Sequence, residues 1–128
     1  MAELTSLQIN GNTVQDFVVA QGTSGIWKYR KWNSGLAECW GDYLFTPTSF
    51  SNISNTLFYC YIGNISTPFK FVSMNTCHIN KRNGGYVTWA TPNVSLDTTA
   101  AVNALIFQYG NSNFAAMRLD IYCKGTWK

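Results

Sequence analysis

The chain has 128 residues, of which 46% are hydrophobic, 16% aromatic and only 12% charged, with a net charge of +3. This length supports one domain with a real core and is too short for two. So little charge indicates a surface that is polar but uncharged, or one that is covered by another copy of the chain. The nine cations form no broad basic stripe, so we expect no nucleic-acid partner. No apolar run approaches the roughly 18 residues that span a bilayer, so we also expect no membrane insertion.

Strand patterns dominate the whole chain, separated by turn-forming residues. Residues 46–56 are polar and predict a loop, whereas the apolar residues 57–62 predict a strand buried on both faces. A helical turn fits only at 97–103, with Asp97 as its N-cap. Strand starts at intervals of about ten to fifteen residues predict an all-β fold, an antiparallel β-sandwich or a jelly-roll-like barrel. In chain order the predicted strands are residues 4–9, 13–20, 25–32, 36–45, 57–62, 69–74 with 77–80 as a candidate continuation, 86–90, 104–109 and 114–124.

Residues 25–41 hold three tryptophans, one tyrosine, three cations and one carboxylate in seventeen positions. They are typical of two strands joined by a turn at 33–35, in which glycine supplies the positive φ of a short loop. A three-residue loop pairs Glu38 with Arg30, and a two-residue loop pairs it with Lys31. Either register joins the carboxylate of the second arm to a cation. The hairpin therefore indicates structure or an interface, and not catalysis.

The first residues carry no basic region, apolar block or cleavage site, so we expect no secretory signal and synthesis in a cytoplasm. The four cysteines would allow two disulfides, but a chain made in a cytoplasm favours free, buried thiols. Their spacing matches no metal knuckle. We therefore expect neither a metal site nor a cofactor. The cysteines are Cys39, Cys60, Cys77 and Cys123.

Residues suited to catalysis are scarce. His78 is the only histidine, and no nucleophile motif lies beside it, so a structural role is favoured for it. Of the six carboxylates, only Glu38 and Asp42 lie close together in the sequence. On one strand they would share a face at a separation of about 13 Å, too far for hydrolysis between two carboxylates. We expect no enzymatic activity.

Loops that combine asparagine, arginine, tyrosine and tryptophan suit saccharides, because aromatic faces stack on sugar C–H groups while amides and guanidinium groups bond to hydroxyls. Two segments, 81–89 and 109–113, have this composition. Packing on a sheet explains the aromatic residues of the first segment equally well, and turn chemistry explains the asparagines of the second. The candidate ligand-binding residues are Arg82, Asn83, Tyr86, Trp89, Tyr109, Asn111 and Asn113.

The hairpin at 25–41 closely resembles the signature G-x-W-x-Y-R-K-W-x-S-G-x-A-E-C-W-G. This signature occurs in the C-terminal domains of tail-fibre and minor structural proteins of phages and prophages of Gram-positive bacteria. Residues 16–24 are similar to the segment that precedes it there, and residues 119–128 resemble the family's final strand, which often ends in Gly-x-Trp-Lys. Residues 46–112 match no pattern of the family and are where host-dependent variation would lie.

The resemblance implies the head of a tail fibre or tail tip, carried on the virion and made in the cytoplasm of the bacterial host. Such domains are commonly all-β, usually trimeric around the fibre axis, and attach to cell-surface polysaccharide or teichoic acid. One domain would cover residues 1–128, with a lead-in at 1–24, the signature hairpin at 25–45 and a closing strand at 114–128. The expected function is glycan binding during adsorption, and the alternative is a structural cap of a tail or fibre.

The same resemblance bears on which residues would recognise the target. A motif that keeps its form across heads with different targets is a poor place to encode the target. Recognition is therefore expected in the loops after residue 80, and contacts with sister subunits or other tail proteins in the hairpin. The scaffold or subunit-contact candidates are Trp27, Tyr29, Arg30, Trp32, Glu38 and Trp40.

Overall fold

The computed structural model describes residues 7–9, 12–14, 16–83, 87–94, 100–112 and 114–128. Within these ranges the regular elements are strands with no helix, and therefore no helix long and apolar enough to cross a membrane. The strands are β1 (Leu7–Ile9), β2 (Asn12–Val14), β3 (Val18–Ser24), β4 (Trp27–Trp32), β5 (Leu36–Phe45), β6 (Ser51–Ser54), β7 (Leu57–Tyr61), β8 (Ile65–Ser66), β9 (Ser73–Asn83), β10 (Thr88–Pro92), β11 (Ala101–Val102), β12 (Ala104–Tyr109) and β13 (Met117–Thr126).

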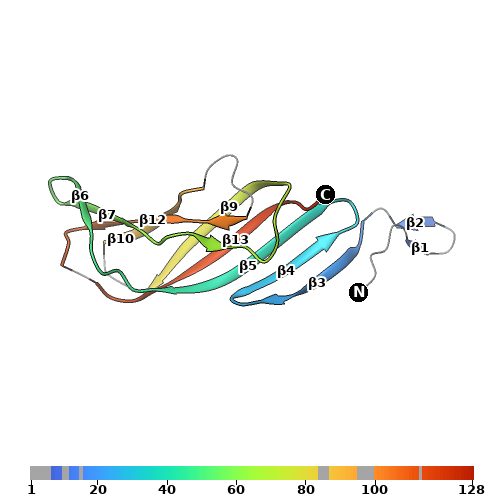
Figure 1. Cartoon of the computed structure of the whole chain (residues 1–128), viewed down its shortest axis with the longest axis horizontal. Helices are drawn as coiled ribbons and strands as arrows, with labels where there is room; N and C mark the ends of the chain where they lie inside the picture. The colour runs from blue at the N-terminus through green and yellow to red at the C-terminus, as the bar shows by residue number, and fades with distance from the viewer. Residues whose placement is uncertain (1–6, 10–11, 15, 84–86, 95–99, 113) are drawn as a thin grey trace.

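Two antiparallel sheets form the body of the molecule (Figure 1). The larger sheet has five strands in the order β3-β4-β5-β13-β9, and the smaller has four in the order β10-β12-β7-β6. Two further pairings join β1 to β2 and β8 to β11. The predicted all-β class with antiparallel sheets is confirmed, and the finer jelly-roll assignment stays a prediction.

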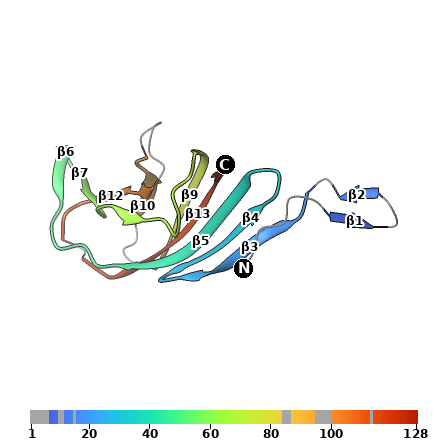
Figure 2. The same cartoon turned by 45° about the vertical axis from the view of Figure 1, so that its right-hand side comes forward.

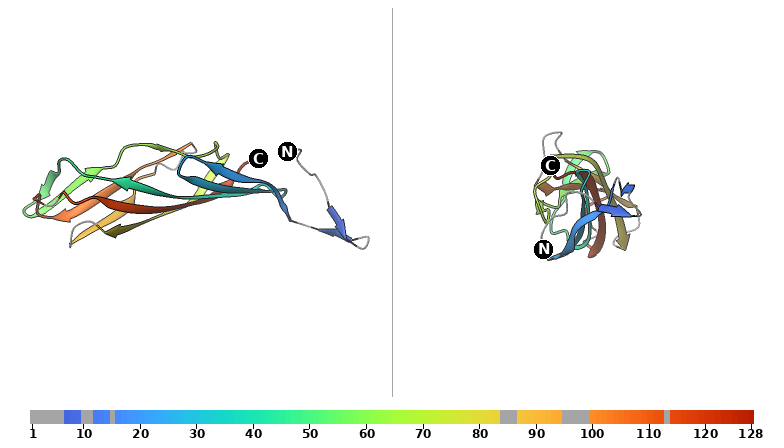
Figure 3. Two further views of the ribbon diagram at one scale, coloured as in Figure 1. Left: turned by 90° about the horizontal axis from the view of Figure 1, so that it is seen from below. Right: turned by 90° about the vertical axis from the view of Figure 1, so that its right-hand side faces the viewer.

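The body is elongated along its strands. Figure 2 shows the two sheets from a second side, and in Figure 3 the β1–β2 hairpin lies beyond one end of the body. Strands β9 and β10 contact each other and so join an edge of the larger sheet to an edge of the smaller one.

A single hydrophobic core lies between the sheets. In β13, Met117, Leu119, Ile121 and Cys123 are at most 2% exposed, while the residues between them are more exposed. This period of two was predicted from the sequence, and it is confirmed. Ile106 of β12 joins the same core from the smaller sheet. The alternation determines which side chains of each strand point away from the core.

The signature hairpin has the three-residue loop of the two alternatives. Arg30 lies opposite Glu38 in the β4–β5 register, and the Gly35 N–H donates to the Trp32 carbonyl over 3.0 Å. Gly35 has a φ of +101°, a conformation that side chains disfavour. The predicted role of glycine in this turn is confirmed.

Two expectations about the region after Pro47 were wrong. Within the predicted loop 46–56, residues Ser51–Ser54 form β6 and pair with β7. This strand is entirely exposed at the sheet edge, so its polar composition concealed it. The strand at 57–62 is not buried on both faces, since Tyr61 is 55% exposed. One side of β7 faces the core and the other faces outwards.

Three shorter segments also differ from the sequence prediction. Strand β9 begins at Ser73, so most of the strand predicted at 69–74 is irregular chain. At the end of the predicted helical turn, Ala101–Val102 forms β11 and pairs with β8, a strand the pattern did not indicate. Residues 95–99 lie outside the described ranges. Strands of two residues are too short to produce a recognisable period.

Candidate functional site

The outer face of the five-stranded sheet carries aligned rows of side chains, because strand register places equivalent positions side by side. One row crosses four strands and consists of Lys28, Trp40, Tyr122 and His78. Both aromatic residues are partly buried, whereas the lysine and the histidine are exposed. An aromatic pair is thus flanked on either side by a polar group.

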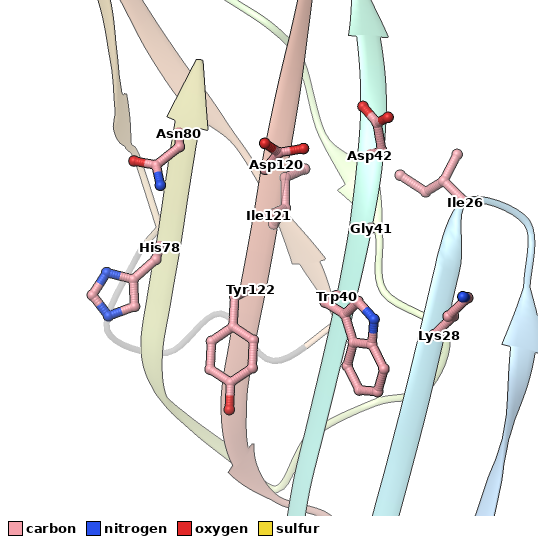
Figure 4. A pocket seen from close by; sticks show the side chains of 10 residues that line it. All are labelled: Ile26, Lys28, Trp40, Gly41, Asp42, His78, Asn80, Asp120, Ile121 and Tyr122. Carbon is pink, nitrogen blue, oxygen red and sulfur yellow. The ribbon is translucent and has the colours of Figure 1, made fainter. Parts of the chain in front are cut away.

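The next row holds carboxylates and an amide. Asp42 lies opposite Asp120, which in turn lies opposite Asn80. Together with the first row, these residues line a hollow of about 560 Å³, open on the outer face of the sheet. Figure 4 shows the rings of Tyr122 and Trp40 next to each other, with the carboxylates of Asp120 and Asp42 two residues away on the same strands. We call this site the hollow.

Arginine side chains hold the two carboxylates of the hollow. Arg82 donates from Nε to Asp120 Oδ2 over 2.7 Å and from Nη2 to Asp120 Oδ1 over 3.0 Å. The same Nη2 reaches Asp42 Oδ2 at 3.2 Å, and Arg118 Nη1 lies 3.6 Å from that oxygen. Asp120, and then Asp42, raise the pKa of the Arg82 guanidinium. The carboxylates are therefore fixed in position by a bidentate contact and its neighbours.

The aromatic floor of the hollow is held from the other side. The Tyr122 hydroxyl donates to Glu38 Oε2 over 2.5 Å. Arg30 Nη1 lies 3.9 Å from Glu38 Oε1, and its guanidinium lies 5.3 Å from the centre of the Trp40 ring. The bond to Glu38, and after it burial, raise the pKa of Tyr122 to about 12. Both rings are thus restrained by the same carboxylate and arginine.

These groups suit binding better than hydrolysis. Asp42 and Asp120 are now cross-strand neighbours, a carboxylate pair that the sequence search missed because 78 positions separate them. A glycosidase requires one protonated carboxyl group as its acid. Here Arg82 donates hydrogen bonds to both side chains, an arrangement that suits fixed polar anchors for a ligand. The rings, amide, imidazole and ammonium group instead supply the mixture of flat apolar and hydrogen-bonding surface that a sugar needs.

Those predicted ligand-binding residues that the structure describes are divided between the two sheets. Arg82 lies on β9 beside the hollow and holds its carboxylates. Trp89 and Tyr109 lie on the outer face of the other sheet, and Asn111 is exposed in the loop after β12. Asn83 ends β9, with its side chain outside what the structure describes. Tyr86 and Asn113 lie outside the described residues.

The predicted scaffold residues lie in the core, at the hollow and at the end of the hairpin. Trp27 is 4% exposed, and its Nε1 donates to the Ser66 carbonyl over 2.7 Å. Tyr29 packs edge-on against Phe69. The Trp32 carbonyl accepts a bond from Nε1 of Trp127 over 2.8 Å, which ties the hairpin to the chain end.

Trp40 was predicted to be scaffold, yet its partly buried ring lines the hollow. His78, for which the sequence favoured a structural role, is exposed on the same outer face. The signal that could have found the hollow is the outward alternation of 38, 40 and 42 and of 118, 120 and 122. That signal becomes usable only once β13 is known to pair with β5.

Among the residues that the structure describes, no group of three or more His, Cys, Asp or Glu side chains is placed to hold a metal ion. Comparison of the chain with models of protein families, with curated proteins and with solved structures found no match. The functional proposal therefore rests on the residues of the hollow and on the signature at 25–41.

Proposed function

We propose that this chain is a non-enzymatic adhesion domain that binds a cell-surface glycan through the hollow on its five-stranded sheet. The observation that carries the proposal is the pair of restrained rings, Trp40 and Tyr122, set beside Asp42, Asp120 and Asn80. A sugar ring has apolar C–H faces and polar edges. It would lie against the rings and bond at its edges to the carboxylates and the amide.

Pre-organisation supports this role. Restraint of Tyr122 by Glu38 and of the two aspartates by Arg82 lowers the conformational entropy that binding would otherwise cost. Lys28 and His78 border the same hollow and add donors at its two sides. These two groups would also accept a phosphate-bearing polymer such as a teichoic acid.

The signature at 25–41 suggests the biological setting. We propose that the domain is the head of a phage tail fibre or tail tip, works on the virion as a homo-oligomer, with a trimer as the expected form, and attaches to host cell-wall polysaccharide or teichoic acid. In this setting Trp40 belongs both to the signature hairpin and to the glycan site, because the hairpin also forms one wall of the hollow. This proposal differs from the expectation that recognition lies in the loops after residue 80.

The test compares two tryptophans on opposite outer faces. A glycan array, followed by purified cell-wall polysaccharide and teichoic acid from candidate hosts, identifies a ligand for the wild-type chain. Affinities are then measured by calorimetry with a short monovalent fragment, so that avidity does not contribute. Trp40→Ala is expected to weaken binding at least about tenfold, as for a central aromatic contact.

The matched control is Trp89→Ala, which removes a partly exposed tryptophan from the other sheet. It is expected to leave the affinity for the monovalent fragment unchanged. Equal losses from both variants, or a loss with Trp89→Ala alone, would place the glycan elsewhere. Absence of binding to any cell-wall polymer by the intact oligomer would reject the proposal.

A structural cap of the tail or fibre is the second candidate. It is favoured by one observation, the uncharged and partly exposed aromatic side chains on the outer face of the four-stranded sheet. Such a surface suits assembly with other protein. In that case the chain would assemble normally and bind no glycan.

A further inference from the structure

The outer face of the four-stranded sheet is apolar and aromatic. Register places Trp89 next to Phe107 and Phe107 next to Tyr59, so one aromatic row crosses three strands. The Trp89 and Phe107 rings stack, with centres 5.5 Å apart and an angle of 18° between their planes. Tyr61 and Leu105 form the adjacent row. We define the aromatic face as Trp89, Phe107, Tyr59, Tyr61, Leu105 and Tyr109.

These side chains point away from the core. Their alternates in β12, Ala104, Ile106 and Gln108, are at most 2% exposed. On the aromatic face itself, Tyr109 is 59% and Tyr61 55% exposed. With 150–250 Å² of surface for each aromatic side chain, the aromatic face exposes roughly 450 Å². This is about half of the ~800 Å² that each partner contributes to a standard interface, and the polar positions around it would supply the rest.

The aromatic face differs from the outer face of the larger sheet in its content of charged residues. No residue of β6, β7, β10 or β12 is charged. The larger sheet instead presents cations and carboxylates, Arg82 and Asp120 among them, on its outer face. An anionic polymer finds no cation on the strands of the smaller sheet. Two identical chains can meet at this face without bringing like charges together. Contact through a charged part of the surface would place like charges of the two chains, each of net charge +3, near one another.

We infer that the aromatic face is the surface through which copies of this chain associate. Apolar sheet faces pack against one another about 10 Å apart. Around a shared symmetry axis, the aromatic faces of neighbouring copies meet, and the exposed rings of each copy are buried against the other copies. The occupant is thus a second copy of the chain, and the glycan of the hollow lies on the opposite outer face. The inference needs no glycan and is tested without one.

Sedimentation analysis of the full chain tests it. The wild type is expected to sediment as a multiple of the 14.4 kDa chain at micromolar concentration. Tyr61→Lys places an ammonium group in the contact and is expected to raise the dissociation constant roughly 100-fold or more, so that single chains predominate. Tyr109→Lys, at the end of β12, is expected to raise the dissociation constant in the same way. It replaces Tyr61→Lys in the test if that variant folds poorly.

The matched control is Leu44→Lys, an apolar-to-lysine change at a 54% exposed position on the outward side of β5. It is expected to leave the assembly intact, and circular dichroism should show the same fold in every variant. A wild type that remains at 14.4 kDa, or equal dissociation by Leu44→Lys, would overturn the inference. The inference would also be overturned if the wild type were a monomer that binds a neutral polysaccharide and Tyr61→Lys did not bind it. That result would assign the aromatic face to glycan binding.

Discussion

At the scale of single residues, the hydrogen bond from Tyr122 to Glu38 is the contact that restrains the floor of the hollow. It spans 2.5 Å, and the Glu38 side chain is only 18% exposed. Tyr122→Phe removes the donor and leaves Glu38 its ion pair with Arg30 at 3.9 Å. We expect the free energy of unfolding to fall by about 1.5 kcal/mol, as for a bond to a charged group. Urea unfolding measures the difference.

The pH dependence of the difference in unfolding free energy between wild type and Tyr122→Phe tests whether the Tyr122–Glu38 hydrogen bond causes it. The pKa of Tyr122 is raised from 10.0 to about 12, first by the bond to Glu38 and then by burial. A raised pKa means that the folded state favours the protonated hydroxyl, so its stabilisation is complete below pH 10 and is lost as pH rises towards 12. The gap between wild type and Tyr122→Phe should therefore narrow in this range.

The same substitution elsewhere provides the control for Tyr122→Phe. Tyr109 is 59% exposed on the single chain, and Tyr109→Phe removes only its hydroxyl group while it keeps the ring that contributes to the aromatic face. We expect this variant to unfold at the wild-type urea concentration. A Tyr122→Phe protein as stable as Tyr109→Phe at neutral pH would contradict the role assigned to the bond.

At the scale of the element, β13 depends on one close approach at its end. The register with β9 shifts between Lys124 and Gly125, at a β-bulge. A Cβ on Gly125 would lie 1.9 Å from the Ser73 carbonyl oxygen and 2.9 Å from Met74 Cα, both backbone atoms. Since β13 is hydrogen-bonded to β5 on one side and to β9 on the other, relief of this clash must move backbone that is paired within the sheet. We expect Gly125→Ala to lower the free energy of unfolding by about 3 kcal/mol or more.

A second glycine in the same sheet offers the comparison for Gly125→Ala. A Cβ on Gly22 of the edge strand β3 would meet only the end of the Tyr29 side chain, at 3.1 Å from its hydroxyl oxygen. That side chain can move, so Gly22→Ala should cost less than 1 kcal/mol, as for a surface change. Urea unfolding of both variants tests the ranking, and similar losses would show that the bulge is not under steric constraint.

Elements with a strong local pattern could be predicted from the sequence. The signature hairpin has its turn residues and charge pairing within seventeen positions, and β13 alternates over its whole length. Strand β6 was missed because three polar residues and one isoleucine, all exposed, give no period, and because its pairing depends on the turn at Asn55, where φ is +50°. The two-residue strands β8 and β11 are defined by their pairing with each other, which a local sequence pattern does not show.

The hollow could not be predicted for a different reason. Its residues are ordinary outward positions on β4, β5, β9 and β13, which lie far apart in the chain. Only the pairing of β5 with β13 brings Asp42 to Asp120 and Trp40 to Tyr122. Loop composition directed attention to Trp89 and Tyr109 instead, because a local pattern cannot report contacts made across a sheet.

At the scale of the whole molecule, three cysteines form a row across β5, β13 and β9 of the larger sheet. Cys123 lies opposite Cys39 on one side and Cys77 on the other, and its Sγ is 3.9 Å from that of Cys77. All are free thiols, as is Cys60 of the smaller sheet. A hydrogen bond to Cys39, with burial, raises the pKa of Cys123 to about 12 against the opposing effect of its contact with Cys77. The buried thiols can therefore serve as alkylation probes for opening of the core.

Thiol labelling then reports whether the two sheets unfold as one unit. Cys39 and Cys123 are 0% exposed, so alkylation near pH 8 requires opening of the core, where an unfolded thiol ionises near 9.0. We expect both to be labelled at one shared rate that rises with urea as global unfolding does, because a single core joins both sheets. Cys60, only partly buried, should be labelled sooner. Pulsed alkylation with mass spectrometry measures each site separately. Labelling of Cys123 as fast as Cys60 in the absence of urea would mean that β13 opens locally. The floor of the hollow, to which Tyr122 of β13 contributes, would then not be held rigidly.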